Sequence, residues 1–175
     1  MDEAVAQFQQ AVALRPDFAD GYNSLGMVLL QHGRVDEAIP ALRKAVELRP
    51  DFAVAHNSLG LALLQNGQFD EALGHFQKAL ELRPDLATAH NNIGSLLFQT
   101  GQLDEALSHF RKAVELRPGF AEAENNLGKV LVGKGQVDQA IVCFQRALAA
   151  RPDFALARSN LDKALLLKGD RSLVP

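Results

Sequence analysis

Two neighbouring columns of polar residues recur at intervals of 34 along the sequence, and their side chains are the ones best suited to bind a ligand. The first column is Asn23, Asn57, Asn91 and Asn125, and the second is Ser24, Ser58, Asn92, Asn126 and Asn160. Asparagine is a poor residue for a helix interior, and its amide offers the donors and the acceptor that an extended peptide backbone requires. The columns therefore predict contact with a polypeptide. A second interpretation stays open, because duplicated units copy residues and asparagine can also bridge adjacent helices.

Apolar and basic residues follow the same stripe and extend the predicted binding surface. The apolar members are Met27, Leu61, Leu30, Leu64 and Phe98, and the basic members are Lys129 and Lys163. Apolar side chains beside amides are typical of grooves that hold a peptide. We therefore expect one groove that carries amides along its length and lysines towards its carboxyl-terminal part.

Histidines also recur in columns, which raises the question of a metal site. His56 and His90 share one column, and His75 and His109 share another that Cys143 continues. Metal ligands must converge to about 2 Å from one ion. Because residues one repeat apart are separated by a whole helix pair, we expect no metal site. Cys143 is the single cysteine, so it has no partner for an internal disulfide.

Residues that could catalyse a reaction do not form a recognisable set. The Asp-Glu pairs begin helices, and the glycines mark turns or packing sites, so there is no phosphate-binding loop or pair of catalytic carboxylates. We expect no catalytic residue and no cofactor, and the chain is not expected to be an enzyme.

The elements that must position the groove follow from a recurring Arg-Pro dipeptide. Its prolines are Pro16, Pro50, Pro84, Pro118 and Pro152, always 34 residues apart. Proline has no N–H to donate and clashes with the preceding turn, and the arginine before it suits the negative end of a helix dipole. Each dipeptide therefore predicts the end of a helix.

Glycines mark a second break within each repeat. They are Gly33, Gly67, Gly101, Gly135 and Gly169, and three residues later come Asp36, Asp70, Asp104 and Asp138. Glycine adopts the left-handed C-cap conformation at little cost, and aspartate is a favourable N-cap. Each repeat is thus predicted to be two antiparallel helices.

The apolar pattern of both helices predicts how they pack. In the first helix, Leu25 and Leu29 lie on one face beside Gly26, and in the second helix Ala38, Leu42 and Ala45 form the stripe. In later repeats the large residue of the second stripe is Phe76, Phe110 or Phe144. A glycine within a helix costs about 1 kcal/mol relative to alanine. Gly26, Gly60, Gly94 and Gly128 therefore indicate close approach of a neighbouring helix.

Together these columns resemble the tetratricopeptide repeat (TPR) over nearly the whole chain. The resemblance implies an all-α fold, a right-handed superhelical solenoid of antiparallel helix pairs, and binding of other polypeptides. The early aromatic residue of the family is only partly kept, since its column reads Tyr22, His56, His90, Glu124 and Arg158. The asparagine columns resemble those with which the repeats of O-linked N-acetylglucosamine transferases hold polypeptides. A carboxylate clamp of the kind found in some TPR domains is disfavoured, because Met27, Leu61 and Ser95 stand where polar clamp groups are needed.

The predicted domain organisation is one uninterrupted array. It comprises a lone second helix at 2–17, full repeats at 19–52, 53–86, 87–120 and 121–154, a closing helix at 155–168 and a tail at 169–175. Leu173, Val174 and Pro175 resemble the start of a thrombin-type site from an expression vector.

Composition limits the classes of partner. The chain is 47% hydrophobic and 22% charged, with a formal net charge of −3 and a pI near 5.9. An acidic balance without a basic stripe disfavours nucleic acid and anionic membranes. The sequence shows neither a secretory signal nor an apolar run of the roughly 20 residues that span a bilayer. We therefore expect a cytoplasmic protein, unless the chain is a fragment of an exported one.

These observations favour a non-enzymatic protein-interaction scaffold that binds a peptide or helix of a partner in its concave groove. The alternative is the substrate-recruiting TPR portion of a larger enzyme such as a glycosyltransferase. The outermost helices also predict a homo-oligomer through the repeat ends. Phe8 lies in a core column of a helix without its repeat partner, and Asp162 replaces the packing glycine of the last helix. Because this aspartate opposes a head-to-tail contact, pairing of like ends through Phe8 is favoured.

Overall fold

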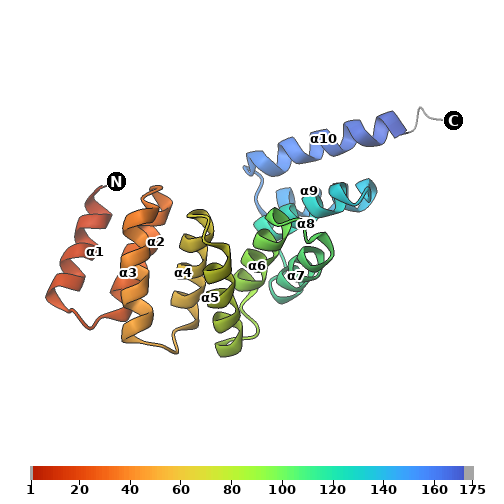
Figure 1. The fold of residues 1–175 in the computed structure, drawn as a ribbon. Coiled ribbons are helices and arrows are strands. Elements are labelled where there is room, and N and C mark those ends of the chain that lie inside the picture. The colour runs from red at the N-terminus through yellow and green to blue at the C-terminus, as the bar shows by residue number, and fades with distance from the viewer. Residues whose placement is uncertain (1, 172–175) are drawn as a thin grey trace. The chain divides into compact units, whose positions relative to one another are not determined.

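The computed structural model describes residues 2–171, and every regular element in that range is an α-helix. The chain divides into two compact units, Met1–Asp85 and Leu86–Pro175 (Figure 1). No helix in the described range is long and apolar enough to cross a membrane.

Unit 1 contains five helices. They are α1 (Asp2–Leu14), α2 (Ala19–Gln31), α3 (Val35–Leu48), α4 (Ala53–Gln65) and α5 (Phe69–Leu82). Helix α2 packs against α3, and α4 packs against α5, so each pair is one repeat. Helix α4 also contacts α2 and α3, which stacks the second repeat on the first.

Unit 2 repeats this plan. Its helices are α6 (Ala87–Gln99), α7 (Leu103–Leu116), α8 (Ala121–Gly133), α9 (Val137–Ala150) and α10 (Ala155–Arg171). Helices α6 and α7 form one pair and α8 and α9 the next, while α10 packs on α9 and α8. The first helices of successive repeats are thus neighbours: α6 contacts α8, and α8 contacts α10.

The predicted core is confirmed in both units. The residues that fill it have almost no exposed surface: Leu42 and Phe76 in unit 1, and Phe110 and Phe144 in unit 2. Each packs on the glycine of its own repeat. A Cβ added to Gly94 would lie 2.8 Å from Cε1 of Phe110, and one added to Gly128 would lie 2.5 Å from Cε1 of Phe144. The glycines are therefore required by the large side chains opposite them.

The turn between the two helices of a repeat is also confirmed, with one exception. Gly33, Gly67, Gly101 and Gly135 have φ between 72° and 81°, a conformation that side chains with a Cβ rarely adopt. Gly169 differs because α10 continues through it to Arg171. The predicted turn at Gly169 is thus wrong, and the closing helix extends beyond the expected residue 168.

The prediction that aspartates cap the second helices is wrong. The N-cap residues are Arg34, Gln68, Gln102 and Gln136, and none makes a side-chain capping hydrogen bond. Asp36 and Asp70 lie inside the first turn instead. A carboxylate there still favours the helix through the positive end of the helix dipole.

At four of its five positions, the arginine before the recurring proline has a role that the sequence pattern did not indicate. Its guanidinium lies over the ring of the phenylalanine three positions later, at 3.6 Å for Arg49 and Phe52 and at 3.5 Å for Arg117 and Phe120, whereas Arg83 is followed at that distance by a leucine. Such cation–π contacts are worth about 0.5–1 kcal/mol at exposed sites. They hold the connection between one repeat and the next.

The outermost helices expose apolar surface. In α1 Val5 and Val12 are buried and Phe8 is half-buried, while Leu14 is 75% exposed. In α10 the exposed leucines are Leu156, Leu165, Leu166 and Leu167. The tail residues Leu173, Val174 and Pro175 lie outside the described residues.

Candidate functional site

In unit 2 the two asparagine columns are joined by hydrogen bonds between neighbouring first helices. Nδ2 of Asn126 on α8 donates to Oδ1 of Asn91 on α6, at 3.0 Å. Nδ2 of Asn160 on α10 donates to Oδ1 of Asn125 on α8, at 2.8 Å. Asparagine therefore does bridge adjacent helices, and the bridges tie α6 to α8 and α8 to α10.

The two columns differ in their accessibility. Asn91 and Asn125 are only 9% and 5% exposed, whereas Asn126, Asn160 and Asn92 are half-buried. In each bridge the second-column residue donates through Nδ2, so Oδ1 of Asn126 or Asn160 takes no part in the bridge. Amides of the second column are thus the ones a ligand can reach first.

Two adjoining hollows lie along this stripe and form what we call the unit-2 groove. The first has a volume of about 450 Å³ and is lined by Asn91, Glu122, Asn125, Asn126, Lys129, Arg151, Phe154, Leu156 and Asn160. The second has a volume of about 310 Å³ and is lined by Phe98, Lys129, Val132, Gly133, Phe144, Asn160, Lys163, Ala164 and Leu167. Lys129 and Asn160 line both hollows, so the two are neighbours along the stripe.

The charges of the unit-2 groove are arranged unevenly. At the first hollow, Nη1 of Arg151 donates to Oε1 of Glu122 at 2.7 Å, so these two charges balance. At the second hollow, Lys129 and Lys163 are both exposed, and Nζ of Lys129 lies 4.9 Å from the ring centre of Phe98. The second hollow is therefore apolar with two cations at its border, and it brings Phe98 together with the lysines expected farther along the groove.

In unit 1 the structure brings fewer of the predicted groove residues to the surface. Asn57 is buried, Asn23 is half-buried, and Met27 and Leu61 are half-buried. Leu30 and Leu64 are both buried in the core, so their assignment to the groove surface is corrected. Ser58 donates to the carbonyl of Val54 in its own helix, at 3.0 Å. The predicted surface is consequently best developed in unit 2.

The histidines pair within a repeat, which the comparison of like positions between repeats did not reveal. Nδ1 of His56 lies 3.0 Å from Nδ1 of His75, and Nδ1 of His90 lies 3.1 Å from Nδ1 of His109. Nε2 of His56 lies 3.0 Å from the carbonyl oxygen of Pro50, to which it must donate. Neutral His56 then accepts at Nδ1, and His75 donates. The shared spacing of 19 residues between the two columns was the signal for this pairing.

These pairs are part of the packing between the two helices of a repeat. Burial, together with repulsion from the paired histidine, lowers the pKa of His75 and of His109. His75 and His109 are therefore favoured in the neutral form. Among residues 2–171, no three histidine, cysteine or acidic side chains gather where they could hold a metal ion.

The model of the tetratricopeptide repeat matches the chain over residues 17–85, 51–119 and 85–153. These overlapping matches cover most of the chain and agree with the helix pairs of both units. No curated protein sequence matches the chain significantly.

Solved structures show the same fold. A thermophilic TPR protein of Thermus thermophilus is 22% identical over 94% of this chain and 90% of its own, with a TM-score of 0.83. PilF of Pseudomonas aeruginosa is 27% identical over 87% of this chain and 69% of its own, with a TM-score of 0.78. MamA is 27% identical over 88% of this chain and 90% of its own, with a TM-score of 0.70. With the family match, these likenesses confirm an all-α helical-repeat solenoid, and the chain belongs to the tetratricopeptide repeat family.

Proposed function

We propose that the chain is a protein-interaction scaffold whose unit-2 groove binds an extended segment of another polypeptide. The observation that carries the proposal is the row of half-buried amides, Asn126 and Asn160, held in place between apolar surface and lysines. The backbone N–H and C=O groups of an extended segment are not paired within the segment itself. The side-chain amide of asparagine can accept from the N–H and donate to the C=O.

The second hollow specifies which side chains of the partner should fit. Phe98 and Leu167 offer apolar contacts, while Lys129 and Lys163 favour a negative charge. A segment in which an aspartate or glutamate is flanked by apolar residues would satisfy both features. Charge at an exposed border contributes to specificity and association rate more than to affinity.

The proposal is non-enzymatic and requires no cofactor. It rests on family membership and on the unit-2 groove. Neither the family match nor the structural likenesses favour the alternative of a substrate-recruiting portion of a glycosyltransferase.

Selection from a library of random linear peptides on the immobilised full chain tests the proposal. We expect enriched peptides to combine an acidic residue with apolar neighbours. Fluorescence polarisation should show that Lys129→Glu weakens their binding by about tenfold or more, which corresponds to about 1.4 kcal/mol. Asn126→Ala should also weaken binding, because it removes an amide that both lines the groove and bridges two helices.

The matched control is Lys112→Glu, which makes the same charge change on α7, where Lys112 pairs with Glu115 outside the unit-2 groove. It should leave peptide affinity unchanged. Peptides that bind Lys129→Glu as tightly as the unaltered chain would show that the groove is not the binding surface.

We infer, as a second property, that copies of the chain self-associate through α1. Leu14 is 75% exposed and Phe8 is half-buried on this helix, and pairing of like ends closes as a dimer. Light scattering at high protein concentration should give a dimer, and Phe8→Glu should give a monomer. Gln9→Glu, which changes the charge of an exposed residue on the same helix, is the control. A monomer at every concentration would refute the inference, and a dimer lost instead on Leu166→Glu would place the contact on α10.

A further inference from the structure

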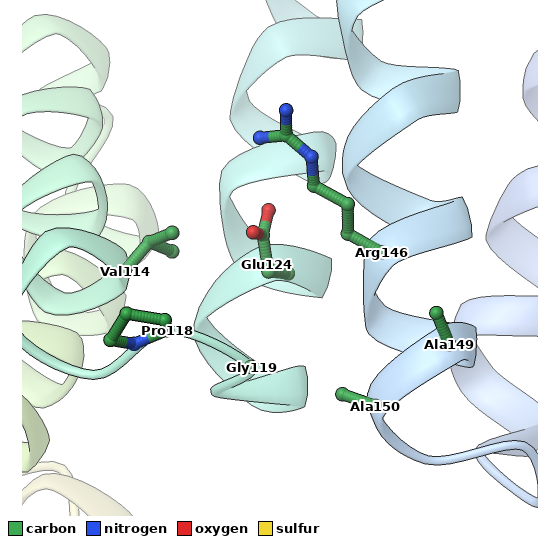
Figure 2. Close-up of a pocket in the computed structure, with 7 residues that line it drawn as sticks. All are labelled: Val114, Pro118, Gly119, Glu124, Arg146, Ala149 and Ala150. Atoms are coloured by element: carbon green, nitrogen blue, oxygen red, sulfur yellow. The ribbon is translucent and has the colours of Figure 1, made fainter.

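A hollow of about 460 Å³ lies between the end of α7, the start of α8 and the end of α9, all within unit 2. It is lined by Val114, Pro118, Gly119, Glu124, Arg146, Ala149 and Ala150 (Figure 2). It shares no residue with the unit-2 groove. We call it the Glu124 pocket.

The lining of this pocket is where the repeat pattern is broken. Ala150 stands in a column that otherwise reads Leu14, Leu48, Leu82 and Leu116. Ala149 stands in a column that reads Ala13, Glu47, Glu81 and Glu115, so it departs from the three preceding repeats, and Gly119 stands in one that reads Asp17, Asp51, Asp85 and Asp153. Departures that are scattered along the sequence therefore meet at one place in the fold.

Each of these departures removes atoms from the pocket. Leu48, Leu82 and Leu116 are half-buried, whereas Ala150 is exposed and lacks the isopropyl group that a leucine carries beyond its Cβ. Gly119 has a φ of +80°, and a Cβ built on it would lie 3.9 Å from Cβ of Ala150 across the pocket. A residue other than glycine would be strained at this φ and would narrow the opening.

A fourth departure places a carboxylate in the pocket. Glu124 replaces the tyrosine or histidine found in the column of Tyr22, His56 and His90, and it is only 3% exposed. Its Oε2 is buried and has no hydrogen-bond partner, while the thiol of Cys143 donates to the carboxylate. Burial raises the pKa of Glu124, which the charge of Arg146 partly opposes. A buried carboxylate oxygen without a donor is costly, so the pocket lacks a donor that a ligand can supply.

The pocket also offers the opposite charge. The side chain of Arg146 extends from α9 past Glu124, with its guanidinium beyond the carboxylate, while Gly119 and Ala150 lie at the other end (Figure 2). Arg146 is exposed, so its guanidinium can move to meet a ligand. Between these charges and the open end, Val114, Pro118 and the two alanines form an apolar wall.

We propose that the Glu124 pocket binds a free α-amino acid with an apolar side chain of about the size of leucine. The ammonium group donates to Glu124, the carboxylate accepts from Arg146, and the side chain fills the space that a leucine at position 150 would occupy. An amine alone would leave Arg146 close to a second cation, and a carboxylate alone would face Glu124. A zwitterion satisfies both groups, and charge-assisted hydrogen bonds are the stronger kind.

Isothermal titration calorimetry on the full chain tests this assignment with four probes. L-leucine should bind saturably. Three analogues each lack one recognised feature: 4-methylpentanoate has no ammonium group, 3-methylbutylamine has no carboxylate, and glycine has no side chain. Each should bind at least about tenfold more weakly than leucine, which is the range for a lost charge-assisted contact or a lost buried side chain.

Two variants on α9 locate the site. Ala150→Leu restores the residue of the other repeats and should reduce leucine binding by about tenfold or more without lowering the unfolding temperature. Val142→Leu adds apolar surface at an exposed position outside the pocket and should leave leucine binding unchanged. Glu124→Gln keeps the shape of the side chain but removes the charge, and it should weaken leucine binding more than 4-methylpentanoate binding.

Three results would each overturn the proposal. The first is no saturable binding of leucine at millimolar concentration. The second is equal affinity of Ala150→Leu and the unaltered chain. The third is tighter binding of 4-methylpentanoate than of leucine, which would show that Glu124 is protonated and that the pocket selects a simple carboxylate. None of these results bears on the unit-2 groove, because the two sites share no residue.

Discussion

Phe110→Ala is expected to lower the free energy of unfolding by about 3–5 kcal/mol, the range for removal of a large aromatic side chain from a packed core. Phe110 is 1% exposed and its ring lies against Gly94, so no neighbouring side chain can move in from solvent to fill the space. Urea denaturation followed by circular dichroism measures the change.

Phe98→Ala is the matched control for this substitution. Phe98 is a half-buried phenylalanine of the same unit, on the border of the unit-2 groove, and its removal should cost clearly less. If Phe110→Ala lowered stability by less than about 1 kcal/mol, the assignment of the α7 core face would be wrong.

Gly128→Ala is expected to destabilise the chain even though alanine forms helices better than glycine. An added Cβ would lie 2.5–2.9 Å from three atoms of the Phe144 ring, which is itself only 1% exposed. Overpacking of this kind costs about 1–3 kcal/mol, against a gain of about 1 kcal/mol in helix propensity. The net effect should therefore be a loss of up to about 2 kcal/mol in the free energy of unfolding, measured by urea denaturation.

Gly74→Ala provides the contrast, with the opposite sign. Gly74 lies within α5, is exposed, and would place a Cβ in open space. Its replacement should raise stability by about 0.5–1 kcal/mol. Should both substitutions stabilise the chain, close helix approach would not be the reason for the glycine in the first helix.

The helical repeat was predictable from the sequence because the same structural constraints recur in several repeats. Pro50, Gly67 and Phe76 each recur with fixed spacing, and each restricts the chain locally, through a missing N–H, a positive φ or a large volume opposite a glycine. Such local rules hold wherever the residue lies. The core columns and turns were therefore predicted correctly, apart from Leu30 and Leu64, which belong to the core, and Gly169, where the helix continues.

The candidate site was less predictable because it depends on contacts between repeats. The recurrence of Asn91 and Asn125 left open whether they contact a peptide or bridge adjacent helices, and both residues accept hydrogen bonds from the next first helix. Leu64 was assigned to the groove although its side chain belongs to the core. Column position gives the face of a helix only approximately, and which side chains remain accessible depends on the neighbouring helix.

The Glu124 pocket shows a different limit. Ala149 and Ala150 are unremarkable in a helix, and Glu124 reads as a surface residue when taken alone. Only the fold shows that these three residues and Gly119 line the same pocket. In a repeat protein, the residues that depart from the pattern can be found by alignment of the repeats, but their convergence requires the structure.

The asparagine bridges of unit 2 have a consequence for the entropy of binding. Because Asn126 and Asn160 are already tied to the preceding first helix, their side chains have lost rotamer freedom during folding. A peptide that meets these amides does not have to immobilise them, whereas each flexible side chain ordered at an interface costs about 0.5–1.5 kcal/mol. The bridges therefore preorganise the surface, and most of the ordering that accompanies binding falls on the partner.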